Sequence, residues 1–193
     1  FTGVFDGGGH AISHLTIRGG SYLGLFGWVS DPNSEIRNLS LIDPNVHGVS
    51  YVGALAGWIE GGMVANCRIV DANVFGTGRE LGYPGLVGGL TASHENGTIT
   101  DCSVLGGCVS GASTVSTVGG LVGNGGRIIR CSVEQVEVVC TRDLFVNVGG
   151  LAATAKEVVE CHVKGELVRG REQVGGLVAR MVGGTISRCY TST

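Results

Sequence analysis

The sequence predicts an all-β protein, a parallel β-helix (β-solenoid) of about six to seven turns, with roughly 30 residues and about three short strands in each turn. Two ladders of residues recur with that period, one of leucines and one mainly of cysteines. Valine, isoleucine and threonine fill the periodic segments, and no long run of apolar residues has helical spacing. Strands in the same phase of successive turns must then lie parallel, about 4.8 Å apart.

A short glycine-rich phrase with a leucine in a fixed place forms the first ladder. Its leucines are separated by 30, 35, 31, 30 and 26 residues, which is the spacing of a solenoid or an array. The glycines beside them predict a tight corner or a close approach of backbones across a narrow interior, so replacing Gly120 or Gly150 by valine should damage folding. The ladder consists of Leu25, Leu55, Leu90, Leu121, Leu151 and Leu177.

The second ladder falls between the leucines, with apolar residues three positions before and two positions after each member. Side chains on a strand alternate between faces, so positions minus three and zero share a face only if the chain bends between them. We expect glycines near that point to form the bend. The ladder is Leu15, Leu39, Cys67, Cys102, Cys131, Cys161 and Cys189; the residues three before it begin with Ile12, and the nearby glycines are Gly62, Gly97, Gly126 and Gly184.

A third, weaker apolar stretch follows in each period, as at Val74 and at Leu167-Val168, and completes the three predicted strands. Because the repeat is unbroken, residues 1–193 are expected to form a single β-solenoid domain. Its inward side chains should stack in columns of like residues.

The cysteine column is expected to hold buried free thiols that act as small apolar side chains. Neighbouring parallel strands keep β-carbons near the strand spacing, whereas a disulfide needs about 3.8 Å. The ladder lacks a Cys-x-x-Cys pair, so it does not indicate zinc, and no cofactor is predicted. Cys108 and Cys140 lie outside the ladder and are the pair to name if one disulfide forms, which leaves the redox compartment open.

The charge of the chain argues against nucleic acid as a partner, because the formal net charge is −3 and no run of lysine or arginine occurs. No stretch reaches the roughly 18 apolar residues that cross a bilayer, so no direct membrane insertion is expected, and no signal peptide is recognisable. The chain begins at Phe1 without an initiator methionine. We therefore expect a fragment of a larger chain, whose missing targeting signals say little about location.

The opening segment 1–17 reads Phe-Thr-Gly-Val-Phe-Asp-Gly-Gly-Gly-His-Ala-Ile-Ser-His-Leu-Thr-Ile. It is followed by Gly-Leu-Phe-Gly at 24–27 and then by the Val-Gly-Gly-Leu-Val-Gly series. These motifs, in this order, resemble the GLUG repeat family over essentially the whole chain. The later copies depart from the pattern where Ala92, Ala153 and Ala179 replace the final glycine.

The resemblance implies large secreted or cell-surface proteins, mostly bacterial, among them adhesin-like proteins and the non-catalytic parts of IgA-specific metallopeptidases. No catalytic residue is attributed to the repeat in that family, so none is carried over to this sequence. An extracellular or cell-surface location is the expectation that follows.

Polysaccharide cleavage is the competing interpretation, because parallel β-helices often use aspartates clustered on one outer face to bind calcium or activate water. The aspartates here never occur in adjacent pairs, and Asp101 is expected to point outward, alone in its column. The histidines fall at unrelated phases of the repeat and form no ligand pair. We therefore predict no enzyme, no catalytic residue and no metal site, and keep a carbohydrate-binding or polysaccharide-degrading β-helix as an alternative.

The longest step between leucines, from Leu55 to Leu90, contains extra residues near 76–84. Insertions in solenoids form loops on one side, which is often the binding side. A solvated loop without a partner is the plainer alternative. The predicted contact patch consists of Arg79, Glu80 and Tyr83, with His94 and Glu95 nearby.

Both ends of the sequence fall within the repeat pattern, without a polar cap to cover an open strand edge. Either neighbouring sequence supplies further turns, or copies of the chain stack end to end. We expect a non-enzymatic extracellular stalk or adhesive surface, whose partners are other segments of its own chain, copies of itself, or a host or matrix glycan or protein. A self-assembling filament subunit is the alternative within the same non-catalytic class.

Overall fold

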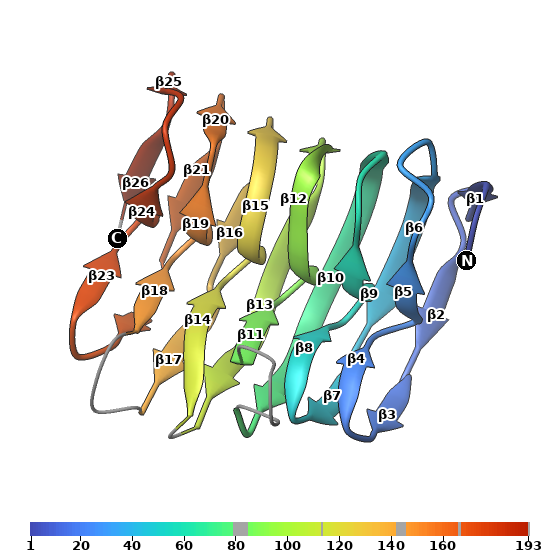
Figure 1. Cartoon of the computed structure of the whole chain (residues 1–193), viewed down its shortest axis with the longest axis horizontal. Coiled ribbons are helices and arrows are strands. Elements are labelled where there is room, and N and C mark those ends of the chain that lie inside the picture. The colour runs from blue at the N-terminus through green and yellow to red at the C-terminus, as the bar shows by residue number, and fades with distance from the viewer. Residues whose placement is uncertain (79–84, 113, 142–145, 166, 193) are drawn as a thin grey trace.

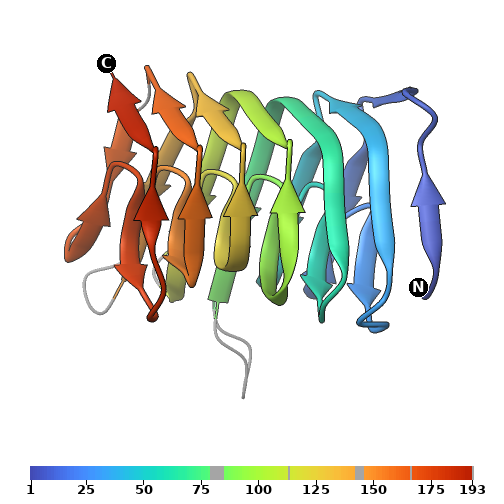
Figure 2. The same cartoon turned by 90° about the horizontal axis from the view of Figure 1, so that it is seen from above.

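The predicted fold class is confirmed: the protein is an all-β parallel β-solenoid of about six turns. The computed structural model describes residues 1–78, 85–112, 114–141, 146–165 and 167–192. Within them the chain forms strands and turns but no helix, and so no helix that could cross a membrane. The strands stack side by side along the long axis, with the two termini at opposite ends of the stack (Figures 1 and 2).

The strands are short, and most contain three or four residues. In chain order they are β1 (Val4–Asp6), β2 (Ala11–Ser13), β3 (Thr16–Arg18), β4 (Ser21–Leu23), β5 (Phe26–Val29), β6 (Glu35–Ile42), β7 (Asn45–Gly48), β8 (Ser50–Gly53), β9 (Ala56–Ile59), β10 (Met63–Gly76), β11 (Gly85–Gly88), β12 (Thr91–Thr100), β13 (Ser103–Gly111), β14 (Val115–Gly119), β15 (Val122–Ile129), β16 (Ser132–Glu134), β17 (Glu137–Cys140), β18 (Asn147–Gly149), β19 (Ala152–Ala155), β20 (Glu157–Val159), β21 (His162–Lys164), β22 (Leu167–Arg169), β23 (Gln173–Gly175), β24 (Val178–Met181), β25 (Ile186–Ser187) and β26 (Tyr190–Ser192).

A turn contains more strands than the three predicted. In the described residues of the last complete turn the chain runs through β20, β21, β22, β23 and β24 before β25 pairs with β20. The two additional strands, β23 and β24, contain the glycine–leucine phrase that we interpreted as a corner alone. In the middle of the solenoid several strands merge, so that the long β10 pairs with both β12 and β13.

The glycine–leucine phrase forms a strand, a corner and a second strand. Its first half lies in a six-stranded parallel sheet made of β4, β8, β11, β14, β18 and β23. At the corner the backbone N–H of Leu121 donates to the carbonyl oxygen of Leu151 in the next turn, at 2.8 Å. A Cβ atom at Gly120 would overlap the carbonyl oxygen of Gly150 in the next turn, so this glycine marks a corner where the backbones of adjacent turns approach closely, and not an approach across the interior.

The predicted bend before the cysteine ladder is confirmed, but glycines do not form it. The residue directly before each ladder position from Leu39 to Cys189 has a left-handed backbone with φ between 51° and 56°. One such residue lets the side chains on both sides of the bend face the interior. The expected glycines lie one corner away, where Gly62 and Gly184 have positive φ. The bend residues are Asn38, Asn66, Asp101, Arg130, Glu160 and Arg188.

The first turn departs from the predicted register. Phe5, rather than Ile12, pairs with Ile36, and Ile12 pairs with Leu41. Leu15 is therefore not a member of the second ladder, and its carbonyl oxygen instead accepts a hydrogen bond from the backbone N–H of Asn45, beyond the ladder residue Leu39. The opening segment also contains a short extra loop at 7–10, between the pairs Asp6–Arg37 and Ala11–Ser40.

Asp6 holds that extra loop in place. Its carboxylate accepts hydrogen bonds from the backbone N–H of Gly8 at 2.9 Å, from Nε of Arg37 at 2.9 Å and from Nδ2 of Asn38 at 3.0 Å. These bonds, that of Gly8 foremost, lower the pKa of Asp6 to about 2. The Phe-Asp-Gly-Gly-Gly-His motif therefore has a structural role, because its aspartate links the first turn to the second.

The interior consists of columns of apolar side chains, as expected. Ile69, Val104 and Val133 pair in register on successive turns and are completely buried. All of the cysteines are free thiols. Cys108 pairs in register with Glu137, and Cys140 pairs with Gly111, so the two lie in different columns and do not form the disulfide considered above.

Candidate functional site

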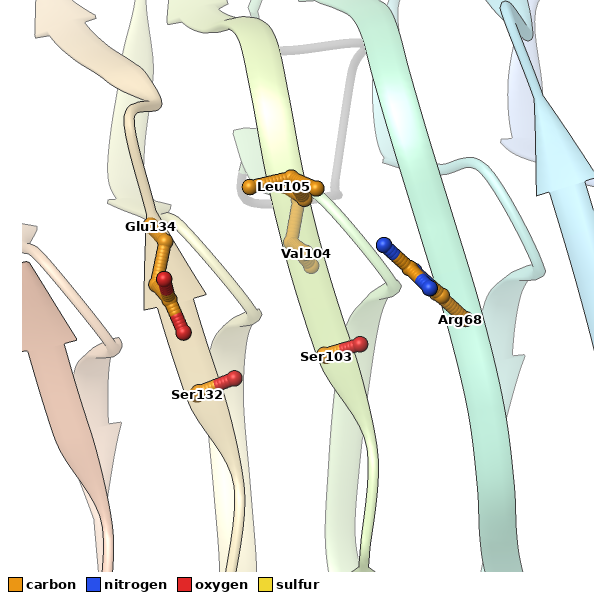
Figure 3. Close-up of a pocket in the computed structure, with 6 residues that line it drawn as sticks. All are labelled: Arg68, Ser103, Val104, Leu105, Ser132 and Glu134. Carbon is orange, nitrogen blue, oxygen red and sulfur yellow. The ribbon is translucent and has the colours of Figure 1, made fainter.

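A hollow lies on the outer surface across β10, β13 and β16, in the middle of the solenoid (Figure 3). Its volume is about 270 Å³. Arg68, Ser103 and Ser132 pair in register on these three strands, and the two serines form the floor. Leu105 and Glu134 stand two residues further along β13 and β16. The hollow exists because two small side chains follow a long one in the same outward column.

The guanidinium of Arg68 is exposed and extends toward β13 (Figure 3). Arg68 forms no hydrogen bond or ion pair with any described residue, because its neighbours in register, Ser40 and Ser103, carry no charge. Arg127, by contrast, is held by the Glu157 carboxylate of the adjacent turn at 2.6 Å. Arg68 therefore brings an uncompensated positive charge to one side of the hollow.

Glu134 forms the opposite side of the hollow. Its Oε1 lies 3.1 Å from Nε2 of His162, and the His162 ring stacks on Tyr190 with 5.2 Å between ring centroids. Two strand spacings, roughly 10 Å, separate the strand of Arg68 from that of Glu134. The hollow thus presents a cation, two hydroxyls and a carboxylate, with Leu105 as an apolar edge.

A cluster of four stacked aromatic rings lies on the first two turns. Trp28 and Trp58 pair in register on β5 and β9, with 5.6 Å between ring centroids and 12° between ring planes. Tyr22 and Tyr51 stack at 4.9 Å, and Tyr51 lies 5.3 Å from Trp58. Ser93 takes the tryptophan position in the next turn, where the cluster ends.

The sequence interpretation missed this cluster, although a signal for it exists. Trp28 and Trp58 each stand three residues after a ladder leucine, so they occupy one phase of the repeat. Tyr22 and Tyr51 have left-handed backbones, with φ of 61° and 54°. That conformation is costly for an aromatic residue, and the ring stack offsets the cost.

The predicted contact residues Arg79, Glu80 and Tyr83 lie outside the described residues. A hollow of about 320 Å³ lies on the face formed by β3, β7 and the end of β10, close in sequence to these residues. Arg18, His47, Phe75 and Thr77 are among its lining residues. The contact role of the loop itself stays a prediction.

His94 does not lie on a contact surface. Its side chain is completely buried, so including it in the contact patch was wrong; only Glu95 of the pair is exposed. Nε2 of His94 lies 3.0 Å from the carbonyl oxygen of Gly61, whereas Nδ1 has no hydrogen-bond partner among the described residues. A Cβ atom at Gly97 would overlap the imidazole of His94, so the missing side chain of this glycine leaves room for the ring.

Burial determines the protonation of His94. It lowers the pKa to about 4, against the opposing effect of hydrogen bonds to the backbone of Gly61 and Gly62. The imidazole is therefore neutral near pH 7, inside the solenoid and away from solvent. This residue is a component of the core.

The described carboxylates differ from the pair that acid–base catalysis needs, which is a carboxyl group of raised pKa beside a second carboxylate. Asp6 and Glu35 are close, but Arg37 lies between them and bonds both at 2.9 Å. The pKa of Asp6 is lowered, and hydrogen bonds from Arg130 lower that of Asp101. The described residues also contain no group of three or more histidine, cysteine, aspartate or glutamate side chains that could hold a metal ion.

The sequence matches no protein-family model. The resemblance to the GLUG repeat family therefore stays a prediction. Over 106 residues, or 53% of this chain, the sequence is 37% identical to halomucin from Haloquadratum walsbyi. The matched segment is 1% of the length of halomucin.

The fold is similar to the crystal structure of a putative immunoglobulin A1 protease from Bacteroides ovatus. The two structures superpose with a TM-score of 0.63, and the match covers 97% of this chain and 59% of the other. The sequences are 17% identical, so the similarity concerns the fold. A β-solenoid of this type is thus found within a longer chain.

Proposed function

We propose that the chain is a non-enzymatic segment of an extracellular or cell-surface protein, in which the solenoid serves as a rigid stalk and an adhesive surface. The observation that carries this proposal is the hydrogen bonding of parallel strands from turn to turn, which continues on both sides of the register shifts in β11 and β12. The leucine corners bond turn to turn, from Leu55 to Leu90, Leu121 and Leu151, at 2.8 Å in each step. A body bonded this way through every described turn resists bending and presents long outer faces.

The comparisons support the same setting. The GLUG-like motifs imply secreted or surface proteins, and a relative named as a mucin fits an extracellular location. Both the relative and the structural neighbour are longer than this chain, as expected for a segment of a large surface protein. Because buried apolar side chains fill the interior, the outward-facing side chains must make any adhesive contacts.

The non-enzymatic part of the proposal is supported by the side-chain chemistry of the outer faces. Where the Asp6 and Glu35 carboxylates come close together, both are bonded to Arg37, and the hydrogen bonds that Asp6 accepts lower its pKa, so Asp6 does not hold the proton that a general acid would donate. His94, the histidine with a strongly shifted pKa, is sealed in the core.

Surface exposure can be tested on intact cells that produce the protein. An antibody raised against residues 1–193 should label intact cells or their medium as strongly as it labels permeabilised cells. Labelling that requires permeabilisation would contradict the proposal. In parallel, immunoglobulin A1 and a set of polysaccharides incubated with the purified chain should show no new amino termini and no new reducing ends; either product would contradict the non-enzymatic assignment.

End-to-end assembly into filaments is a second candidate, favoured by apolar side chains on the outermost described turns. Val4 is 59% exposed near one end, and Ile186 and Tyr190 are 46% and 58% exposed near the other. Light scattering on a sizing column, with negative-stain microscopy of the same fraction, distinguishes the two. Fibres that grow in length would favour the filament, and a monodisperse monomer would favour the stalk segment.

A further inference from the structure

We infer that the hollow between Arg68 and Glu134 is a binding site for a carboxylate-bearing sugar, that is, for a uronate unit of an acidic glycan. This inference rests on the proposed function and names the partner class of its adhesive surface. The site lies on the middle turns, so its exposure does not depend on what adjoins either end of the solenoid (Figures 1 and 3).

Arg68 supplies the anion-binding group. A guanidinium donates two parallel hydrogen bonds to one carboxylate, and it does so most effectively when no protein carboxylate competes. Arg130 and Arg188 also face outward, but each is already bonded to a protein carboxylate. Arg130 is bonded to Asp101 at 2.7 Å, and Arg188 to Glu160 at 2.8 Å. Arg68 has serine neighbours on both sides and keeps its donors for a ligand.

The remainder of the hollow suits the hydroxyl groups of a sugar. The hydroxyls of Ser103 and Ser132 can each donate and accept, and the Glu134 carboxylate only accepts. Oε1 of Glu134 faces His162, and no described residue bonds Oε2, which leaves it for a ligand hydroxyl. The side chain of Leu105 offers an apolar contact to the C–H groups of a pyranose ring.

The arrangement of charge favours a glycan over an acidic peptide. A peptide rich in aspartate or glutamate would place a second carboxylate near Glu134, at a cost in repulsion. A uronate carries one carboxylate and several hydroxyls, which matches a cation at one side and an acceptor roughly 10 Å away. Successive turns repeat about every 4.8 Å, so a glycan chain can extend across the neighbouring strands of the same face.

The test uses the whole chain and neutral tetrasaccharides that each carry a single uronate unit, either galacturonate, glucuronate or mannuronate, titrated calorimetrically in a buffer with a metal chelator. We expect at least one of them to bind, and the methyl ester of that tetrasaccharide to bind about tenfold more weakly or worse, because its carboxyl group is neutral. R68Q should weaken binding by about tenfold or more. S132L, which fills the hollow, should abolish it.

R169Q is the matched control, since Arg169 is an exposed arginine on β22 with no partner among the described residues. Its affinity should stay within about twofold of the unchanged chain, and circular dichroism should show all variants folded. Absence of binding to all three tetrasaccharides would overturn the inference, as would unchanged binding by R68Q or equal binding of tetra-aspartate. Cleavage of a bound tetrasaccharide, seen as new reducing ends, would instead overturn the non-enzymatic function and leave the site in place.

Discussion

Asp101 and Arg130 lie one above the other on successive turns, joined by two hydrogen bonds of 2.7 Å between the guanidinium and the carboxylate. Both are bend residues, with φ of 55° and 51°. The same column continues with Glu160, which accepts a hydrogen bond from Arg188 at 2.8 Å. The left-handed bend thus points its side chains outward, and opposite charges follow one another along the solenoid.

Removing the Asp101–Arg130 pair should destabilise the protein only slightly, because both side chains are about half exposed. A double-mutant cycle with D101N and R130Q should give a small, favourable coupling free energy, which falls in 1 M salt. The Arg130 guanidinium lowers the pKa of Asp101, so the coupling should be present at neutral pH and lost as the pH falls through the lowered pKa. A coupling that is unchanged by acid and salt would contradict this account.

The bend itself should tolerate glycine better than a branched residue. Asn66, with φ of 51°, bonds Asn38 at 2.8 Å, and both N66G and N66V lose that bond. The difference between the two variants then measures the backbone alone. We expect N66V to be less stable than N66G by about 1–2 kcal/mol in urea unfolding; equal stabilities would mean that the left-handed bend is not formed.

Most of the fold could be predicted from the sequence, because residues that stack in one column recur in the sequence at a fixed spacing of about one turn. The number of strands could not, since β23 and β24 are short and are separated only by Gly176 and Leu177, within a glycine-rich phrase that indicates a corner. The bend residues also escaped prediction. Arg130 and Glu160 are not typical left-handed residues, and their conformation is imposed by the turns above and below.

Substitution of Gly120 should be severely destabilising. A Cβ atom there would overlap the backbone carbonyl of Gly150, which cannot move without breaking the bonds of the next turn. We expect G120V to lose about 3 kcal/mol or more, or to fail to fold. Gly20 is the control, because a Cβ atom at that position would meet no other atom within 4 Å, and G20A should change the stability by no more than about 0.5 kcal/mol.

The buried His94 predicts a loss of stability in mild acid. Its pKa is about 4 in the folded chain and 6.5 when exposed, so between these values the unfolded chain binds a proton that the folded chain does not. Stability is therefore complete above pH 6.5 and falls by about 3 kcal/mol as the pH drops to 4. The variant H94L should lack this part of the pH dependence, whereas H10Q, at an exposed histidine, should retain it. An H94L profile parallel to that of the unchanged chain would count against the burial.

The candidate site was less accessible to sequence reasoning than the fold. Ser103 and Ser132 follow ladder cysteines directly, as Arg68 does, so the shared column could have been derived from the period. What the sequence did not show is that Arg68 lacks a partner, because that depends on which side chains of adjacent turns can reach it. The same holds for His94, whose burial depends on the space that Gly97 leaves for its ring.

Hydrogen exchange measured residue by residue tests most directly the central claim, that the turns form one continuous bonded body. The amides of Leu55, Leu90 and Leu121, at the corners of successive turns, should exchange together and only through global unfolding. Their free energies of exchange should match the free energy of unfolding measured in urea. Turns that exchange independently, each with its own lower free energy, would contradict a rigid solenoid stalk.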